Sequence, residues 1–140
     1  MSKTINLEDF FTEEREKEGV WFEPRIKGVP CGIEFLLTGR STDENVAGGE
    51  RYDRAVAELD DIKDPLEKSK KQKELFANRV AEFVKGIRPV EGSAVMYCGK
   101  PLEYSVPMIQ KLLLQAPLIT GQIFNFVTDT ANFMKRKNNA

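Results

Sequence analysis

The sequence predicts a mainly helical α+β protein that forms a single domain over residues 1–140. In several segments after residue 42, apolar residues recur at the three- and four-residue spacing of amphipathic helices. Residues 20–40 instead alternate apolar and polar side chains, as strands do. A length of 140 residues suits one domain, and 41% hydrophobic with 31% charged residues is typical of a chain that folds.

The N-terminal segment is predicted to form a helix over residues 6–18. Asn6 can cap this helix, because a short polar side chain can accept hydrogen bonds from the first backbone N–H groups. Leu7, Phe10 and Phe11 share one face, and the rest of the segment is highly charged. We therefore expect the helix to dock on the core through its first turn and a half.

Residues 20–40 are predicted to form a β-hairpin. Turn-forming glycine and proline residues separate its two alternating runs. Pro24 lies inside the first run and cannot donate a ladder hydrogen bond, which indicates an edge strand or a bulge. Trp21 in the same run can be either a core residue or an anchor for a partner.

Two charged helices are predicted over residues 42–87. Ser41 begins a capping box for the first helix, which Gly48-Gly49 are expected to weaken. Asp64-Pro65 can begin the second helix, whose first half is nearly all polar and is expected to project into water. Its second half carries apolar residues at helical spacing, which should anchor it: Phe76, Val80, Phe83, Val84 and Ile87.

The C-terminal part is predicted to contain a loop over residues 88–104 and two helices over residues 105–137, separated at Pro117. Ser105 can cap the first of these helices. The last helix is apolar on more than one stripe, so its flank is a candidate surface for another chain. With the hairpin tryptophan, the candidate partner-binding residues are Trp21, Phe124, Val127, Phe133 and Met134.

The composition argues against catalysis. The chain has no histidine, the side chain that most often acts as a general base or metal ligand near neutral pH. Cys31 and Cys98 cannot complete a zinc site alone; they are expected to be reduced, with a disulfide as the alternative. The acidic residues between Glu58 and Asp64 are interpreted as a solvated helix end. We expect no catalytic, metal or cofactor site, and the protein is predicted not to be an enzyme.

The charge balance limits the classes of partner. A net charge of −1, from 21 basic and 22 acidic residues, argues against a dedicated nucleic-acid binder. The basic run Lys68, Lys70, Lys71 and Lys73 alternates with acidic residues and is interpreted as a solvated helix face. No apolar run approaches the ~20 residues that cross a bilayer, and the N-terminus lacks a signal-peptide pattern, so a cytoplasmic location is expected.

The order of segments resembles a known family. A charged N-terminal helix ending in glycine leads into the hairpin GVWFEPRIKGVP, two charged helices follow, and the chain closes with PLEYSVPMIQKLLLQAPLITGQIFNFVTDTANFMKRK. This layout resembles the tail assembly chaperones of long-tailed, siphovirus-like bacteriophages. That family often has a charged residue just before the closing Asn-Phe pair, where this chain has Thr130-Ala131. The matching positions are Ala116, Pro117, Ile119, Gln122, Ile123, Asn132 and Phe133.

The resemblance implies a non-catalytic protein that binds and solubilises the tape-measure protein while the tail is assembled. It also implies the tail tube protein as a second candidate partner, self-association into a homo-oligomer, a location in the host cytoplasm, and absence from the mature virion. The first alternative interpretation is a structural subunit of the phage tail or head–tail connector, and the second, less favoured one is a regulator or an enzyme with an unrecognised site.

Overall fold

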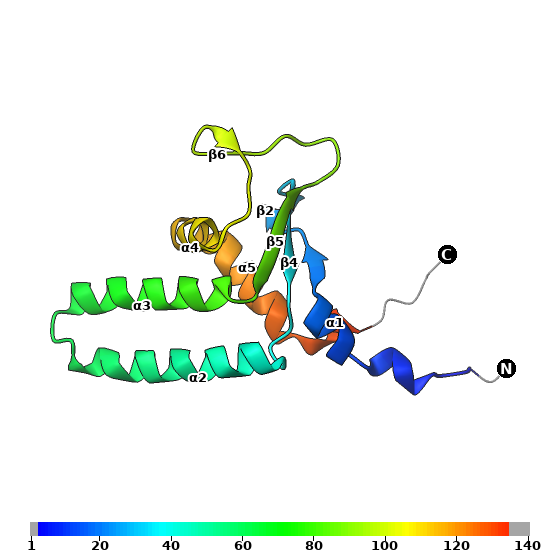
Figure 1. Cartoon of the computed structure of the whole chain (residues 1–140), viewed down its shortest axis with the longest axis horizontal. Helices are drawn as coiled ribbons and strands as arrows, with labels where there is room; N and C mark the ends of the chain where they lie inside the picture. The colour runs from blue at the N-terminus through cyan, green and yellow to red at the C-terminus, as the bar shows by residue number, and fades with distance from the viewer. Residues whose placement is uncertain (1–2, 135–140) are drawn as a thin grey trace.

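The computed structural model describes residues 3–134 and has the mainly helical α+β architecture that the sequence predicts. A three-stranded antiparallel sheet in the order β1-β4-β5 packs against a group of helices (Figure 1). Its strands are β1 (Val20–Phe22), β4 (Ile33–Leu37) and β5 (Val84–Pro89). The α-helices are α1 (Glu13–Glu18), α2 (Asp43–Glu58), α3 (Pro65–Ala81), α4 (Val106–Gln115) and α5 (Pro117–Thr128).

The predicted hairpin over residues 20–40 is confirmed. Strand β1 pairs with β4 so that Trp21 lies opposite Leu36. Two short strands, β2 (Arg25–Ile26) and β3 (Val29–Pro30), extend the hairpin at its tip. Lys27 and Gly28 between them have φ angles of 52° and 77°, as the tight turns that suit the twist of hairpin strands require. A second small hairpin pairs β6 (Met96–Tyr97) with β7 (Lys100–Pro101).

The prediction that the second charged helix reaches residue 87 is wrong at its C-terminal end. Helix α3 ends at Ala81, and the following residues form β5, in which Ile87 lies opposite Phe35 of β4. The three-residue spacing of Val84 and Ile87 fits a helix, whereas a regular strand would place the two side chains on opposite faces. A register irregularity at Leu36 and Leu37 pairs Val84 with Leu37 and Ile87 with Phe35. The strand prevails because the second edge of β4 must find partners for its backbone N–H and C=O groups, which sequence periodicity alone cannot show.

The predicted N-terminal helix is broken into two pieces. A 3-10 turn, η1 (Leu7–Phe10), is separated from α1 by Phe11 and Thr12. The expected docking through Leu7, Phe10 and Phe11 is wrong, since these side chains are 72%, 56% and 67% exposed. The segment instead docks through α1, where the backbone of Gly39 donates a hydrogen bond to the carbonyl of Glu16 (2.9 Å).

Helix α2 begins with a different cap from the one that the sequence suggested. The hydroxyl of Thr42, and not that of Ser41, accepts a hydrogen bond from the backbone of Asn45 (3.2 Å). Glu44 does not complete a capping box; its carboxylate pairs with Lys85 at the start of the sheet's third strand (2.7 Å). The helix runs without interruption through its two glycines.

The remaining helix starts lie where the sequence placed them. Asp64 accepts a hydrogen bond from the first turn of α3, Ser105 accepts one from the first turn of α4, and Pro117 opens α5. Helix α5 ends at Thr128, earlier than expected, and a 3-10 turn, η3 (Thr130–Phe133), follows it. The part of the last predicted helix at residues 135–137 lies outside the described residues.

The core forms where the sheet meets α3, α4 and α5. Helices α2 and α3 lie side by side as an antiparallel pair that extends away from this core (Figure 1). The outer end of the pair is charged, and Lys68 there lies 3.5 Å from Asp60 of the 3-10 turn η2 (Leu59–Asp61). The large, fully buried apolar side chains of the core are Phe35, Leu37, Val80, Phe83, Val84, Ile109, Leu113, Ile123, Val127 and Phe133.

Candidate partner-binding groove

The prediction that five residues bind a partner at the surface is wrong for two of them. Val127 and Phe133 are completely buried. Helix α5 packs against α3 and α4, which encloses Val127 in the core. Phe133 folds back from η3 and stacks edge-on against Phe126, with ring centroids 5.8 Å apart. Both residues therefore stabilise this chain's own core.

The other three candidates are partly buried and contact different parts of the chain. Phe124 on α5 stacks edge-on against Phe76 on α3, with ring centroids 5.2 Å apart. Trp21 on β1 lies under the guanidinium of Arg88, 3.8 Å from the ring centroid. The backbone carbonyl of Met134 accepts a hydrogen bond from Arg15 (2.9 Å). The structure does not bring these residues together into one surface.

An apolar groove instead lies where α3, α4 and α5 meet. Its volume is about 260 Å³. Leu114 forms part of its wall and is 43% exposed, and Leu118, the residue after the lining residue Pro117, is 68% exposed. The lining residues are Lys73, Phe76 and Ala77 of α3, Leu113 and Leu114 of α4, and Pro117, Thr120 and Gly121 of α5.

The sequence around Pro117 explains the shape of this groove. Pro117 cannot continue α4, so the chain turns there and α5 begins. The hydroxyl of Thr120 donates to the carbonyl of Leu113 (2.5 Å) and closes the corner between the two helices. Gly121 has no side chain, and a Cβ added there would meet nothing within 4 Å. The corner therefore leaves an open hollow beside α3.

The size and lining of the groove limit what it can bind. Cavities that hold drug-sized molecules are typically about 300–1,000 Å³ and mostly enclosed. This groove is smaller and open, so it suits one or two apolar side chains that project from another polypeptide. Amphipathic helices place such side chains in apolar grooves of this kind. The arrangement therefore supports protein binding through helix anchors.

The groove is not among the surfaces predicted from the sequence, because the broad apolar side of the last helix is the stronger signal. A signal was present in the run Leu112-Leu113-Leu114, since three consecutive leucines on one helix cannot all face the same core. In the structure Leu113 is buried and Leu114 is exposed. Leu114, three residues before Pro117, is therefore the sequence signal for the groove.

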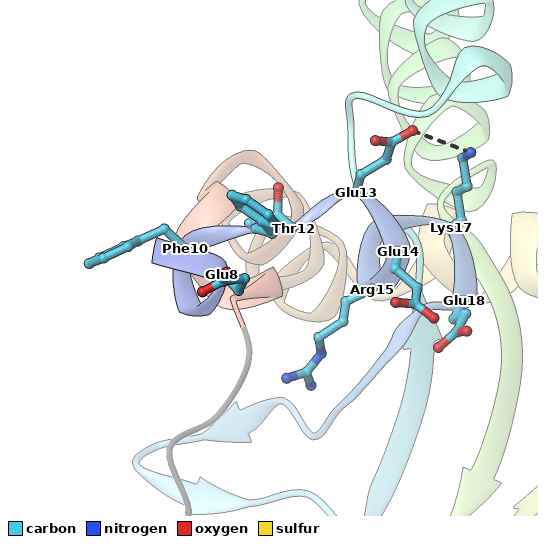
Figure 2. Close-up of a pocket in the computed structure, with 9 residues that line it drawn as sticks. Glu8, Phe10, Thr12, Glu13, Glu14, Arg15, Lys17 and Glu18 are labelled. Atoms are coloured by element: carbon cyan, nitrogen blue, oxygen red, sulfur yellow. Dashed lines mark ion pairs between the residues drawn. The ribbon is translucent and has the colours of Figure 1, made fainter. Parts of the chain in front are cut away.

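A larger hollow of about 1110 Å³ lies along residues Glu8–Glu18 (Figure 2). Its walls come from this one continuous segment, so it is the open space beside a projecting piece of chain. Figure 2 shows Phe10 pointing away from the other labelled side chains, and Glu13 paired with Lys17 across one helical turn (3.4 Å). Both partners of that ion pair are exposed, so it contributes little stability.

A buried polar cluster joins α2 and α3 to the end of β4. The side-chain amide of Asn45 donates to the hydroxyl of Thr38 (2.9 Å) and to the carbonyl of Gly39 (2.7 Å). Arg79 donates to the carbonyl of Asn45 (2.9 Å). Burial lowers the pKa of Arg79 below its ordinary value, and the nearby carboxylate of Glu82 partly opposes this shift. These contacts hold the helical pair in place.

Within residues 3–134, no three His, Cys, Asp or Glu side chains are grouped so that they could hold a metal ion. Cys31 and Cys98 are not bonded to each other. Among the helices of the same residues, none combines the length and the apolar character that crossing a bilayer requires.

Comparison of the chain with protein-family models, with curated proteins and with solved structures finds no match in any of the three. The groove between α3, α4 and α5 and the resemblance in segment order are therefore the observations on which a function can be argued.

Proposed function

We propose that this protein is a non-catalytic chaperone of bacteriophage tail assembly that binds the tape-measure protein. The observation that carries the proposal is the apolar groove between α3, α4 and α5, with Leu114 exposed on its wall and Leu118 exposed directly after the lining residue Pro117. An amphipathic helix of the tape-measure protein would insert its apolar side chains there. The resemblance in segment order supports the tape-measure protein as the client, and the groove supplies a means of binding it.

The energetics of such a groove suit a chaperone that must release its client. Fully burying one leucine side chain gains about 1.5–3 kcal/mol relative to exposing it. Part of this gain is offset by the cost of association, so one groove holds one helix weakly and reversibly. Several copies along a long client would together keep its apolar segments from aggregating and still dissociate when the tail tube forms.

The charged faces of α2 and α3 fit the same role. In the first half of α3, Glu67, Lys70 and Lys71 are exposed to water. They would keep a complex with an apolar client in solution. The protein would act in the host cytoplasm and be absent from mature particles. Its presence in purified virions would favour a structural tail or connector subunit instead.

Co-expression with the tape-measure protein tests this proposal. The variant Leu114→Glu/Leu118→Glu places two carboxylates at the groove, and we expect it to reduce the soluble yield of the client several-fold. The matched control, Val46→Glu/Leu66→Glu, makes the same chemical change at two exposed apolar residues outside the groove and should retain the wild-type yield. Equal client yields with both variants would refute the groove as the client site.

A further inference from the structure

The N-terminal arm, residues 5–11, presents apolar side chains without packing them on the rest of the described chain. Leu7, Phe10 and Phe11 are mostly exposed, and Ile5 is exposed as well. The spacing of the first three is i, i+3 and i+4, which places them on one face of a helix. Leu7–Phe10 form the 3-10 turn η1, and Phe11 follows it in an extended conformation, so the third anchor joins this face when the turn extends by one residue. This is the anchor pattern of a helix that docks into an apolar groove.

The charges of the arm and the groove are complementary. Between its apolar anchors the arm carries Glu8 and Asp9, and it contains no basic residue. The described residues that line the groove include one cation, Lys73, and no carboxylate. Lys70 and Lys111 are exposed and stand one helical turn before Lys73 and Leu114. An acidic arm is therefore attracted to this groove more than a neutral or basic segment would be.

The arm is placed for the groove of another molecule rather than for its own. Hydrogen bonds from the backbones of Gly39 and Ser41 to Glu16 hold α1 against the end of the sheet. In Figure 1 the arm leaves from there on the side opposite the α2–α3 turn, and the sheet lies between it and α4. To reach its own groove the arm would have to pass around its own sheet. The arm of a second copy can approach the groove without this obstacle.

We infer that the groove between α3, α4 and α5 receives the N-terminal arm of a second copy of this chain. The arm and the groove are different surfaces, so the contact is head-to-tail. Each copy then offers one arm and one groove, and such contacts form chains or closed rings. This goes beyond the proposed function and does not depend on what the client is. A client helix in the groove would displace the arm and dissociate the assembly.

Sedimentation velocity of the purified full chain, with no client present, tests the inference through three variants. Phe10→Ser/Phe11→Ser removes the two aromatic anchors of the arm. Gly121→Trp fills the groove from a position where a Cβ meets nothing within 4 Å. Val46→Trp is the control for bulk, since it adds the same side chain on the exposed face of α2. Circular dichroism checks that each variant is folded, and Leu114→Glu, at an exposed residue of the groove wall, replaces Gly121→Trp should the latter fail to fold.

We expect the wild type and Val46→Trp to assemble as their concentration rises, and the arm variant and the groove variant to remain monomeric alone. Mixing the arm variant with the groove variant should give a 1:1 dimer that grows no further. The intact arm of the groove variant then binds the intact groove of the arm variant, and no second contact of this kind is left. A monomeric wild type would overturn the inference. Assembly by either single variant, or failure of the mixture to pair while the wild type assembles, would overturn it too. None of these results depends on client binding.

Discussion

At the scale of single residues, Asn45 joins three segments that are separated in sequence. Its side chain is 1% exposed and donates to residues that follow β4, and its backbone carbonyl accepts from Arg79 on α3. A polar residue in the first turn of a helix ordinarily faces water. Sequence reasoning could therefore not identify this residue as buried, because its partners come from other elements.

Replacing Asn45 with alanine should lower the free energy of unfolding by about 2–3 kcal/mol, because two hydrogen bonds are lost and the carbonyl of Gly39 is left unsatisfied. Urea unfolding measures the change. The control Asn78→Ala alters an exposed asparagine on α3 and should stay within about 0.5 kcal/mol of the wild type. Equal stabilities of the two variants would contradict the account of the buried cluster.

Two glycine-to-alanine substitutions should have opposite effects on stability. A Cβ at Gly39 would overlap the Cβ and Cγ atoms of Glu16, so Gly39→Ala should destabilise the fold by about 1–3 kcal/mol. Gly121→Ala adds a Cβ in open space inside α5 and should stabilise it by about 0.5–1 kcal/mol. Thermal unfolding measures the melting temperature of each variant against the wild type. A shift of both melting temperatures in the same direction would show that the packing around Gly39 or Gly121 is misassigned.

At the scale of elements, the sequence predicts what is local and misses what depends on distant pairing. The starts of α3, α4 and α5 follow from Asp64, Ser105 and Pro117, because caps and proline act on the next few residues. Strand β5 depends on β4, which lies almost fifty positions earlier in the chain. The groove likewise requires three helices to meet, and periodicity within one helix does not show which face its neighbours leave open.

The contact between Arg88 and Trp21 should stabilise the sheet. Arg88 on β5 places its guanidinium over the ring of Trp21 on β1 and pairs with Glu34 of the strand between them (3.2 Å). Replacing Arg88 with methionine keeps an aliphatic chain but removes the cation, and should cost about 0.5–1 kcal/mol. Arg88→Lys keeps the cation and should cost less. The fluorescence of Trp21, the single tryptophan, reports urea unfolding; a methionine variant as stable as the wild type would exclude this contribution.

At the scale of the whole molecule, the core is built from both ends of the chain. Phe133 of η3 is completely buried, stacks against Phe126 of α5 and belongs to the same core as residues of the sheet and of α3. Arg15 of α1 donates to the carbonyl of Met134 and connects the N-terminal segment to η3. The hairpin, the helical pair and the C-terminal helices therefore depend on one another, as in a single cooperative unit.

A chain that ends at Tyr104 should not fold. It would retain the sheet and the α2–α3 pair but lose Ile109, Leu113, Ile123 and Val127, which are completely or almost completely buried. The apolar faces of α3 and the sheet would then be exposed to water. Far-ultraviolet circular dichroism on heating should show no cooperative transition. A sharp transition would mean that the C-terminal helices are a separate unit.

The central claim is that the molecule acts through the groove between α3, α4 and α5. A photo-reactive benzoyl-phenylalanine placed at Leu114, on the wall of the groove, tests it in cells that also produce the tape-measure protein. Irradiation should join the two proteins covalently, whereas the same probe at Val46 of α2, which is slightly more exposed than Leu114, should join them little or not at all. Cross-linking of similar extent from both positions, or from Val46 alone, would contradict the claim.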